Sequence, residues 1–223
     1  MEGESGCILS PMIIESRAKA PFLKNGFLLA CEDTRQAVLI DPGDEIADLL
    51  AVVERRGLTV GHILLTHAHM DHVSGVAEAK RRTGAPIGLH RDDLFLYDRA
   101  VQQGAMFGYT LERPPAPDFF YAPDQPLVFG RHQIGVRHTP GHSPGGVCLS
   151  VAATPEKMHL FVGDTLFAGS IGRTDLPGGD YPTLIASIRS VLFAFGDEAI
   201  VHSGHGPETT IGEERRTNPF LQD

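Results

Sequence analysis

Residues 66–72, THAHMDH, place His67, His69, Asp71 and His72 within six positions of the chain. Two imidazoles that are two residues apart point to the same side of an extended backbone. A turn directly after them would bring the aspartate and the third histidine towards a neighbouring point. Imidazole together with carboxylate suits zinc, iron or manganese. A solvated histidine-rich loop is the alternative, but this pattern is too specific to expect by chance, and it predicts a metal site.

Three more candidate ligands lie in glycine-rich turns at the ends of predicted strands: His142 in HTPGHSPGG, Asp164 in FVGDTLFAG and His205 in HSGHGPE. A rigid scaffold commonly presents a site in this way. Together with the first cluster they make seven ligands, too many for one tetrahedral zinc and suited to two divalent ions that share a ligand. Asp164 is the best shared ligand, because a carboxylate has two oxygens. Zinc is favoured, with iron or manganese as alternatives.

The elements that must position these residues alternate between strand and helix. Residues 37–41 and the apolar run before the histidine cluster read as buried strands, and between them lies a helix that Asp44 caps and Gly57 ends. A short helix that ends at Gly84 and another strand follow. Residues 91–109 read as helical, and the proline-rich residues 113–126 as a surface excursion or lid. Four short strands, a helix with Pro182 near its start and a closing strand complete the pattern. The order predicts an α/β protein with two packed sheets in a single domain, residues 1–223.

The composition narrows the classes of function. The formal net charge of −9 argues against a sequence-independent nucleic-acid binder, which needs a basic face. No apolar run approaches the roughly 20 residues that span a bilayer, and the acidic start MEGESGCILS lacks the pattern of a signal peptide. The three cysteines are far apart and outside any CxxC spacing, which suits a reducing compartment. We therefore expect a soluble, cytoplasmic protein, and the sequence leaves its oligomeric state open.

At this point the ordered set THAHMDH, TPGHSPGG, GDTLFAGSIGRTD and GHGPET resembles the metallo-β-lactamase superfamily of metal-dependent hydrolases, from about Ile13 to the C-terminus. GDTLFAGSIGRTDLPGGD and the ending GEERRTNPFLQD make the chain similar to the glyoxalase II-like branch in its short form. The resemblance implies an αββα four-layer sandwich with the site at one edge of the two sheets. It also implies two metals with Asp164 between them, one bound by His67, His69 and His142 and the other by Asp71, His72 and His205.

The resemblance has one departure. The two-domain glyoxalase II enzymes continue into a helical segment that helps to hold glutathione, whereas 18 residues follow His205 here. The resemblance therefore implies the hydrolytic site more firmly than it implies glutathione specificity.

Two close divalent cations would lower the pKa of a bound water to near 7 and so supply hydroxide to attack an acyl carbon. Asp71 or Asp164 would orient this nucleophile or accept its proton, which makes them the candidate catalytic residues. A thiol, with a pKa near 8.5, leaves without a strong general acid, whereas an amine needs one. The predicted reaction is therefore hydrolysis of a small acyl-thiol substrate, such as an S-2-hydroxyacylglutathione.

Several residues near these turns have two interpretations each. Asp41 either bonds a ligand imidazole or starts the turn at Pro42. Arg173 either pairs with Asp175 or meets a substrate carboxylate. Tyr181 either touches substrate or packs at a helix start, and residues 106–109 form either a pocket wall or ordinary core. His138 and His202 lie near ligand turns and are the better candidates, among the remaining histidines, for contact with a ligand.

Three rival functions stay open. A persulfide dioxygenase on the same scaffold would use a single iron held by His67, His142 and Asp164. Lactone, β-lactam or phosphodiester hydrolysis would use the same hydroxide. A metal-binding regulatory module is the third class. The complete second ligand set favours thioester hydrolysis over the dioxygenase.

Overall fold

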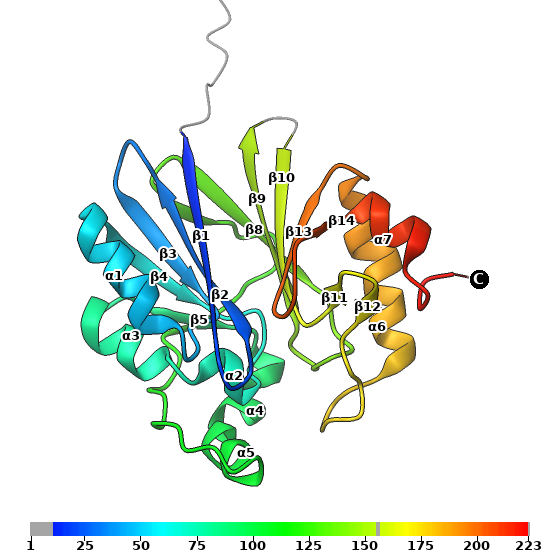
Figure 1. Cartoon of the computed structure of the whole chain (residues 1–223), viewed down its shortest axis with the longest axis horizontal. Helices are drawn as coiled ribbons and strands as arrows, with labels where there is room; N and C mark the ends of the chain where they lie inside the picture. The colour runs from blue at the N-terminus through cyan, green and yellow to red at the C-terminus, as the bar shows by residue number, and fades with distance from the viewer. Residues whose placement is uncertain (1–10, 155–156, 223) are drawn as a thin grey trace, which may run out of the picture.

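The computed structural model describes residues 11–154 and 157–222, and within them two six-stranded sheets pack face to face (Figure 1). The first sheet contains, in spatial order, β1 (Met12–Lys19), β2 (Lys24–Cys31), β3 (Gln36–Ile40), β4 (Thr59–Leu64), β5 (Ile87–Leu89) and β6 (Phe119–Phe120). The second contains β14 (Thr209–Thr210), β13 (Ile200–Ser203), β10 (Lys157–Gly163), β9 (Val147–Thr154), β8 (His132–His138) and β7 (Leu127–Phe129). A small ribbon pairs β11 (Leu166–Phe167) with β12 (Ser170–Ile171).

Helices cover the outer face of each sheet (Figure 1). Those before residue 110 are α1 (Ile46–Arg56), α2 (Met70–Val73), α3 (Val76–Thr83), η1 (Arg91–Asp93), α4 (Leu94–Asp98) and α5 (Ala100–Met106). Those after residue 180 are α6 (Tyr181–Ser187), the π turn η2 (Ile188–Leu192), the 3-10 turn η3 (Phe193–Phe195) and α7 (Ile211–Thr217). Because α1 and α3 flank the first sheet while α6 and α7 flank the second, the layers are helix, sheet, sheet, helix. The predicted αββα sandwich is confirmed.

Three apolar clusters fill the three interfaces between these layers. The residues of β2 show how one strand serves two of them: Phe27 and Leu29 face the second sheet, whereas Leu28 and Ala30 face the helix layer. Such a strand is buried on both faces and therefore reads as a continuous apolar run rather than an alternating one. A third cluster joins the other face of the second sheet to α6 and α7.

The sequence-based helix boundaries are confirmed at their C-terminal ends and wrong at one start. Gly57 and Gly84 end α1 and α3 in left-handed conformations that favour glycine. Asp44 is not the N-cap of α1: Glu45 occupies that position, and it makes no side-chain capping bond. The Asp44 carboxylate instead accepts hydrogen bonds from Ser74 Oγ, at 3.0 Å, and from the Tyr109 hydroxyl. These long-range partners outweigh the local preference of aspartate for the cap.

The proline-rich segment after residue 111 is also more regular than expected. It contains β6, which pairs in parallel with β5 at the edge of the first sheet. A strand of only two residues between prolines has too few residues for its sequence pattern to predict it. In the described residues, no helix combines the length and apolar character needed to cross a membrane.

Candidate metal centre

The structure brings all seven predicted ligands to one end of the two sheets. His67 and His69 follow β4, and Asp71 and His72 lie on the short helix α2 directly behind them. The other three come from loops of the second sheet. They are His142 in the turn between β8 and β9, Asp164 after β10 and His205 after β13. Loops that leave neighbouring strands at the same edge therefore meet here, although their ligands are up to 138 positions apart in the sequence.

His67, His69 and His142 form the first ligand set. His142 Nε2 lies 3.2 Å from His67 Nε2 and 2.8 Å from His69 Nδ1. Two nitrogens bound to one tetrahedral zinc at 2.0–2.1 Å would be about 3.3 Å apart, so the three atoms converge as a metal requires. All three rings are buried. Burial lowers the pKa of His69 to about 3 and the pKa of His67 well below its usual value. Both rings are therefore neutral at pH 7, which is the form that binds metal.

Asp71, His72 and His205 form the second set. Asp71 Oδ2 lies 3.2 Å from His205 Nε2 and 3.8 Å from His72 Nε2. Burial alone would lower the pKa of His72, but the carboxylates of Asp164, Asp71 and Asp41 raise it to about 10. The second set thus provides an environment that stabilises positive charge.

Asp164 lies close to residues of both sets. Its Oδ1 is 3.3 Å from His72 Nε2, and its Oδ2 is 3.6 Å from both His142 Nε2 and His205 Nε2. Space for this carboxylate depends on Gly204, where a Cβ atom would lie 2.2 Å from Asp164 Oδ1. The position is the one that a shared ligand needs.

Two buried atoms test whether the residues present fit a metal. His72 Nε2 and Asp164 Oδ1 are both buried and lie 3.3 Å apart, but neither makes a hydrogen bond of good geometry with any of the described residues. Leaving such groups unpaired is costly in a protein interior. A cation bound by both atoms would satisfy them, so the donor set fits a metal centre.

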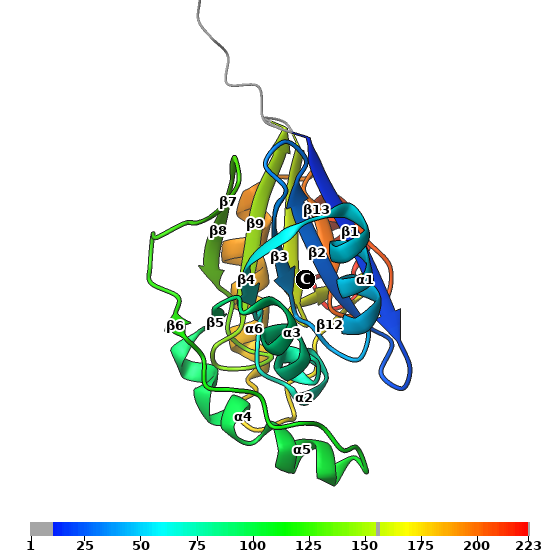
Figure 2. The same cartoon turned by 90° about the vertical axis from the view of Figure 1, so that its left-hand side faces the viewer.

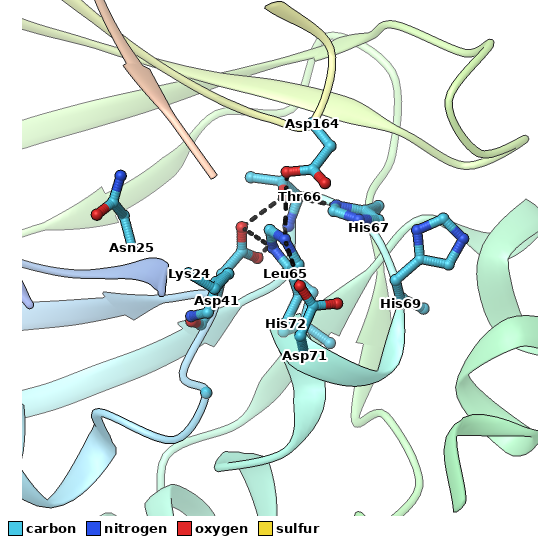
Figure 3. Close-up of polar contacts among 12 residues, drawn as sticks. Lys24, Asn25, Asp41, Leu65, Thr66, His67, His69, Asp71, His72 and Asp164 are labelled. Carbon is cyan, nitrogen blue, oxygen red and sulfur yellow. Dashed lines mark hydrogen bonds and ion pairs between the residues drawn. The ribbon is translucent and has the colours of Figure 1, made fainter. Parts of the chain in front are cut away.

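Outer contacts orient the ligand rings. Asp41 Oδ2 accepts a hydrogen bond from His72 Nδ1, at 3.0 Å, and the same carboxylate accepts from Thr66 N and Thr66 Oγ1, at 2.7 and 2.5 Å (Figure 3). Likewise His142 Nδ1 donates to the Arg173 carbonyl oxygen at 2.7 Å. Each bond fixes the tautomer so that Nε2 faces the site. Of the two interpretations of Asp41, the contact with a ligand imidazole is the one observed.

Replacing Asp41 by Asn is expected to weaken metal binding by about 10- to 100-fold, the usual effect of losing such an outer partner. The amide can still accept from Thr66 N, but its NH2 group then opposes the N–H of His72. Metal affinity measured by competition with a chromogenic chelator checks this. Asp44→Asn is the control, because Asp44 bonds Ser74 and Tyr109 and no ligand. Equal affinities in the two variants would contradict the role of Asp41.

A buried ion pair that sequence reasoning missed lies beneath Asp41. Lys24 Nζ is 2.9 Å from Glu45 Oε1 and donates to the Asp41 carbonyl oxygen, while Glu45 Oε1 also accepts from Gly43 N at 2.8 Å. Lys24 and Glu45 are 2 % and 1 % exposed. The pair fixes the backbone at Asp41, whose φ of 47° lies in the left-handed region. The only sequence signal was a lysine three positions before the apolar run that starts at Phe27.

Lys24→Met is expected to lower the free energy of unfolding by about 3–5 kcal/mol, since it leaves the Glu45 carboxylate buried and unpaired. Urea unfolding measures this. The double variant Lys24→Met, Glu45→Met removes both charges and should recover most of the loss. A single variant as stable as the wild type would contradict the observed pairing.

Two further residues hold the ligand loops together. Asn25 donates from its backbone N to Gly204 O, at 2.7 Å, and from Nδ2 to Gly206 O, at 2.8 Å, which anchors the turn that carries His205. Asp93 is fully buried and accepts from Ala68 N, at 3.0 Å, and Ser143 Oγ, at 2.8 Å. It thereby joins the two loops of the first ligand set. Neither residue had a signal in the sequence.

The remaining candidates fall at the margins of the site. Arg173 pairs with Asp175 through two bonds of 2.7 Å, so the predicted brace is present. The residue is also among those that line the cleft over the ligands. Tyr181 begins α6 and is 48 % exposed. His138 bonds the Pro144 carbonyl oxygen, and His202 bonds His159, each at 2.8 Å. The hydrogen bonds found in residues 11–154 and 157–222 do not connect either histidine to a ligand.

The comparisons with known proteins agree with this arrangement. The family model of the metallo-beta-lactamase superfamily matches residues 21–205. The chain therefore belongs to the metallo-β-lactamase superfamily, and within it the chain is a metallo-hydrolase.

Particular relatives lie within the same family. The chain is 40% identical over 195 residues to hydroxyacylglutathione hydrolase GloC of Haemophilus influenzae, a match that covers 86% of this chain and 91% of that protein. Among solved structures it resembles TTHA1623 in a di-iron-bound form, with 42% identity, a TM-score of 0.82 and coverage of 93% and 100% of the two chains. It also resembles the BLEG-1 B3 metallo-beta-lactamase, with 37% identity, a TM-score of 0.85 and coverage of 95% and 100%.

Proposed function

We propose that this chain hydrolyses thioesters of small acyl groups, such as S-2-hydroxyacylglutathione, at a centre of two divalent metals. The observation that carries the proposal is the presence of two complete ligand sets on either side of Asp164. The similarity to GloC of Haemophilus influenzae supports the substrate class, and the similarity to a di-iron-bound structure supports two metals. Zinc is our first choice of metal, with iron or manganese as alternatives.

In the reaction, the acyl C–S bond breaks and a C–O bond to water forms, which yields a carboxylic acid and a thiol. When bound, two cations would lower the pKa of a bound water and neutralise charge that develops on the acyl oxygen. Asp71 and Asp164 line the cleft and are placed to orient the water or accept its proton. No Lys, Glu or Tyr side chain is among the described residues that line the cleft. A thiolate is thus the leaving group that this site can best release.

We also assign Arg173 to the substrate, because this residue is among those that line the cleft. The proposal does not extend to Tyr181, which is not among the cleft-lining residues. It also treats residues 1–223 as one domain, because the cluster between the sheets draws on both halves of the chain.

A small substrate panel tests the proposal on protein with measured metal content. Thiol release from S-lactoylglutathione, followed with a chromogenic thiol reagent, is the expected result. If a fully metallated sample releases no thiol but consumes oxygen with glutathione persulfide, the dioxygenase is correct instead. The similarity to BLEG-1 favours β-lactam hydrolysis as a second candidate. Turnover of a chromogenic cephalosporin above that of the thioester would support that reaction.

A further inference from the structure

An apolar groove adjoins the metal cleft. Its apolar lining comes from α4, α5 and the loop before α6, and consists of Phe95, Leu96, Met106, Phe107, Leu176 and Pro177. Gln103, Phe107 and Leu176 line both the groove and the cleft, so the two hollows are adjacent. Figures 1 and 2 show α4 and α5 at the same end of the molecule as the ligand loops.

The groove exposes large apolar side chains to water. Met106 is 84 % exposed and Phe107 is 56 % exposed, at the end of α5. The sequence allowed residues 106–109 to be either core or pocket wall. Because Met106 and Phe107 are exposed, these two residues are not core. The position of the groove relative to the cleft is fixed by a hydrogen bond. Gln103 Oε1 accepts from Met70 N at 2.7 Å, and Met70 begins the helix that carries Asp71 and His72. An occupant of the groove therefore has a defined position relative to the metal ligands.

The volumes of the two hollows favour an occupant that extends through both. The cleft has a volume of about 190 Å³ and the groove about 210 Å³, each below the roughly 300–1,000 Å³ of sites that enclose a whole small molecule. A substrate that extends through both would have its reacting carbon in the cleft and one arm in the groove.

We infer that the groove binds an apolar acyl arm of the substrate, an aliphatic chain or an aryl group attached to the thioester carbonyl. A thioester has two arms, and the thiol-carrier arm of biological thioesters is rich in amides and charge. Burying those groups without partners is unfavourable, and Arg99 is the one charged residue among the described residues that line the groove. The carrier therefore stays towards solvent while the acyl arm occupies the groove.

This inference rests on the proposed thioester hydrolysis, and its test separates the two. Glutathione thioesters with unbranched acyl groups of two to eight carbons share one carrier. For the wild type, kcat/KM should rise about two- to fourfold for each added methylene, as apolar surface is buried. The variant Met106→Gln, Phe107→Gln should show at most half of that logarithmic slope. Phe220→Gln, which changes another exposed aromatic residue on the surface beyond α7, is the matched control and should keep the wild-type slope.

Binding of the carboxylate products to the metallated protein, measured by calorimetry, gives a readout without turnover. If product affinity rises with chain length in the wild type and not in the groove variant, the groove binds the acyl arm. This result would stand even if no thioester is cleaved, and only the proposed function would then fail. A flat dependence on chain length, or an equal slope in the groove variant, overturns the inference. So does a wild-type dimer that the groove variant converts to a monomer, because a second copy would then cover the groove.

Discussion

Asp164→Asn is expected to reduce kcat/KM for the thioester by more than about 100-fold. Loss of a residue that only supports a metal ligand costs up to about 100-fold, and Asp164 is itself proposed as a ligand of both metals. Asp164 lies within 3.3–3.6 Å of ligand nitrogens from both sets. An amide carries no charge and offers one oxygen, so it cannot hold two cations together. The expected loss therefore includes both affinity for metal and rate.

Thiol release and elemental analysis of the same sample check this prediction. Asp48→Asn, which changes an exposed carboxylate on α1, is the matched control and should behave as the wild type. Circular dichroism confirms that the fold is kept. Activity within tenfold of the wild type, with two metals still bound, would exclude Asp164 as the shared ligand.

Removal of metal by exhaustive chelation should abolish thiol release and also lower the thermal midpoint. The carboxylates of Asp41, Asp71 and Asp164 surround His72 and raise its pKa to about 10. Loss of the cations therefore leaves a protonated His72 as the charge that compensates three carboxylates. A ligand present at 1,000 times its Kd stabilises the folded state by about 4 kcal/mol. Differential scanning calorimetry before and after chelation, and again after zinc, iron or manganese is restored, measures the change.

The variant Asp164→Asn provides the comparison for this experiment. Its midpoint should respond much less to chelation than that of the wild type, because one shared ligand is missing. If the wild type keeps its activity and its midpoint at negligible metal content, the metal centre has no part in catalysis or stability.

The sequence predicted the local elements of the site well because its signals are local. Short apolar runs that end in Gly-rich turns mark where strands leave a sheet, and the ligands lie directly after such runs. That His205 returns to the cluster around His67 depends on tertiary packing. The sequence indicated it only through the place of His205 in a glycine-rich turn after a predicted strand, and the resemblance to a known superfamily implied its partners. The metal role of each ligand stays a prediction until metal is measured.

The contacts that support the site were not predictable, for a physical reason. The Lys24–Glu45 pair and the contacts of Asp93 join segments that are distant in the sequence and share no recognisable spacing. The same holds for Asp44, whose capping preference is overridden by partners 30 and 65 positions away. Long-range pairing of this kind has no periodic pattern to reveal it.

The most direct test of the account is a titration of metal-free protein with zinc, iron or manganese while thiol release from S-lactoylglutathione is recorded. We expect activity to reach its maximum at two equivalents per chain, with elemental analysis of the active sample giving the same ratio. Full activity at one equivalent, or one bound iron accompanied by oxygen uptake in place of thiol release, would contradict a shared two-metal centre.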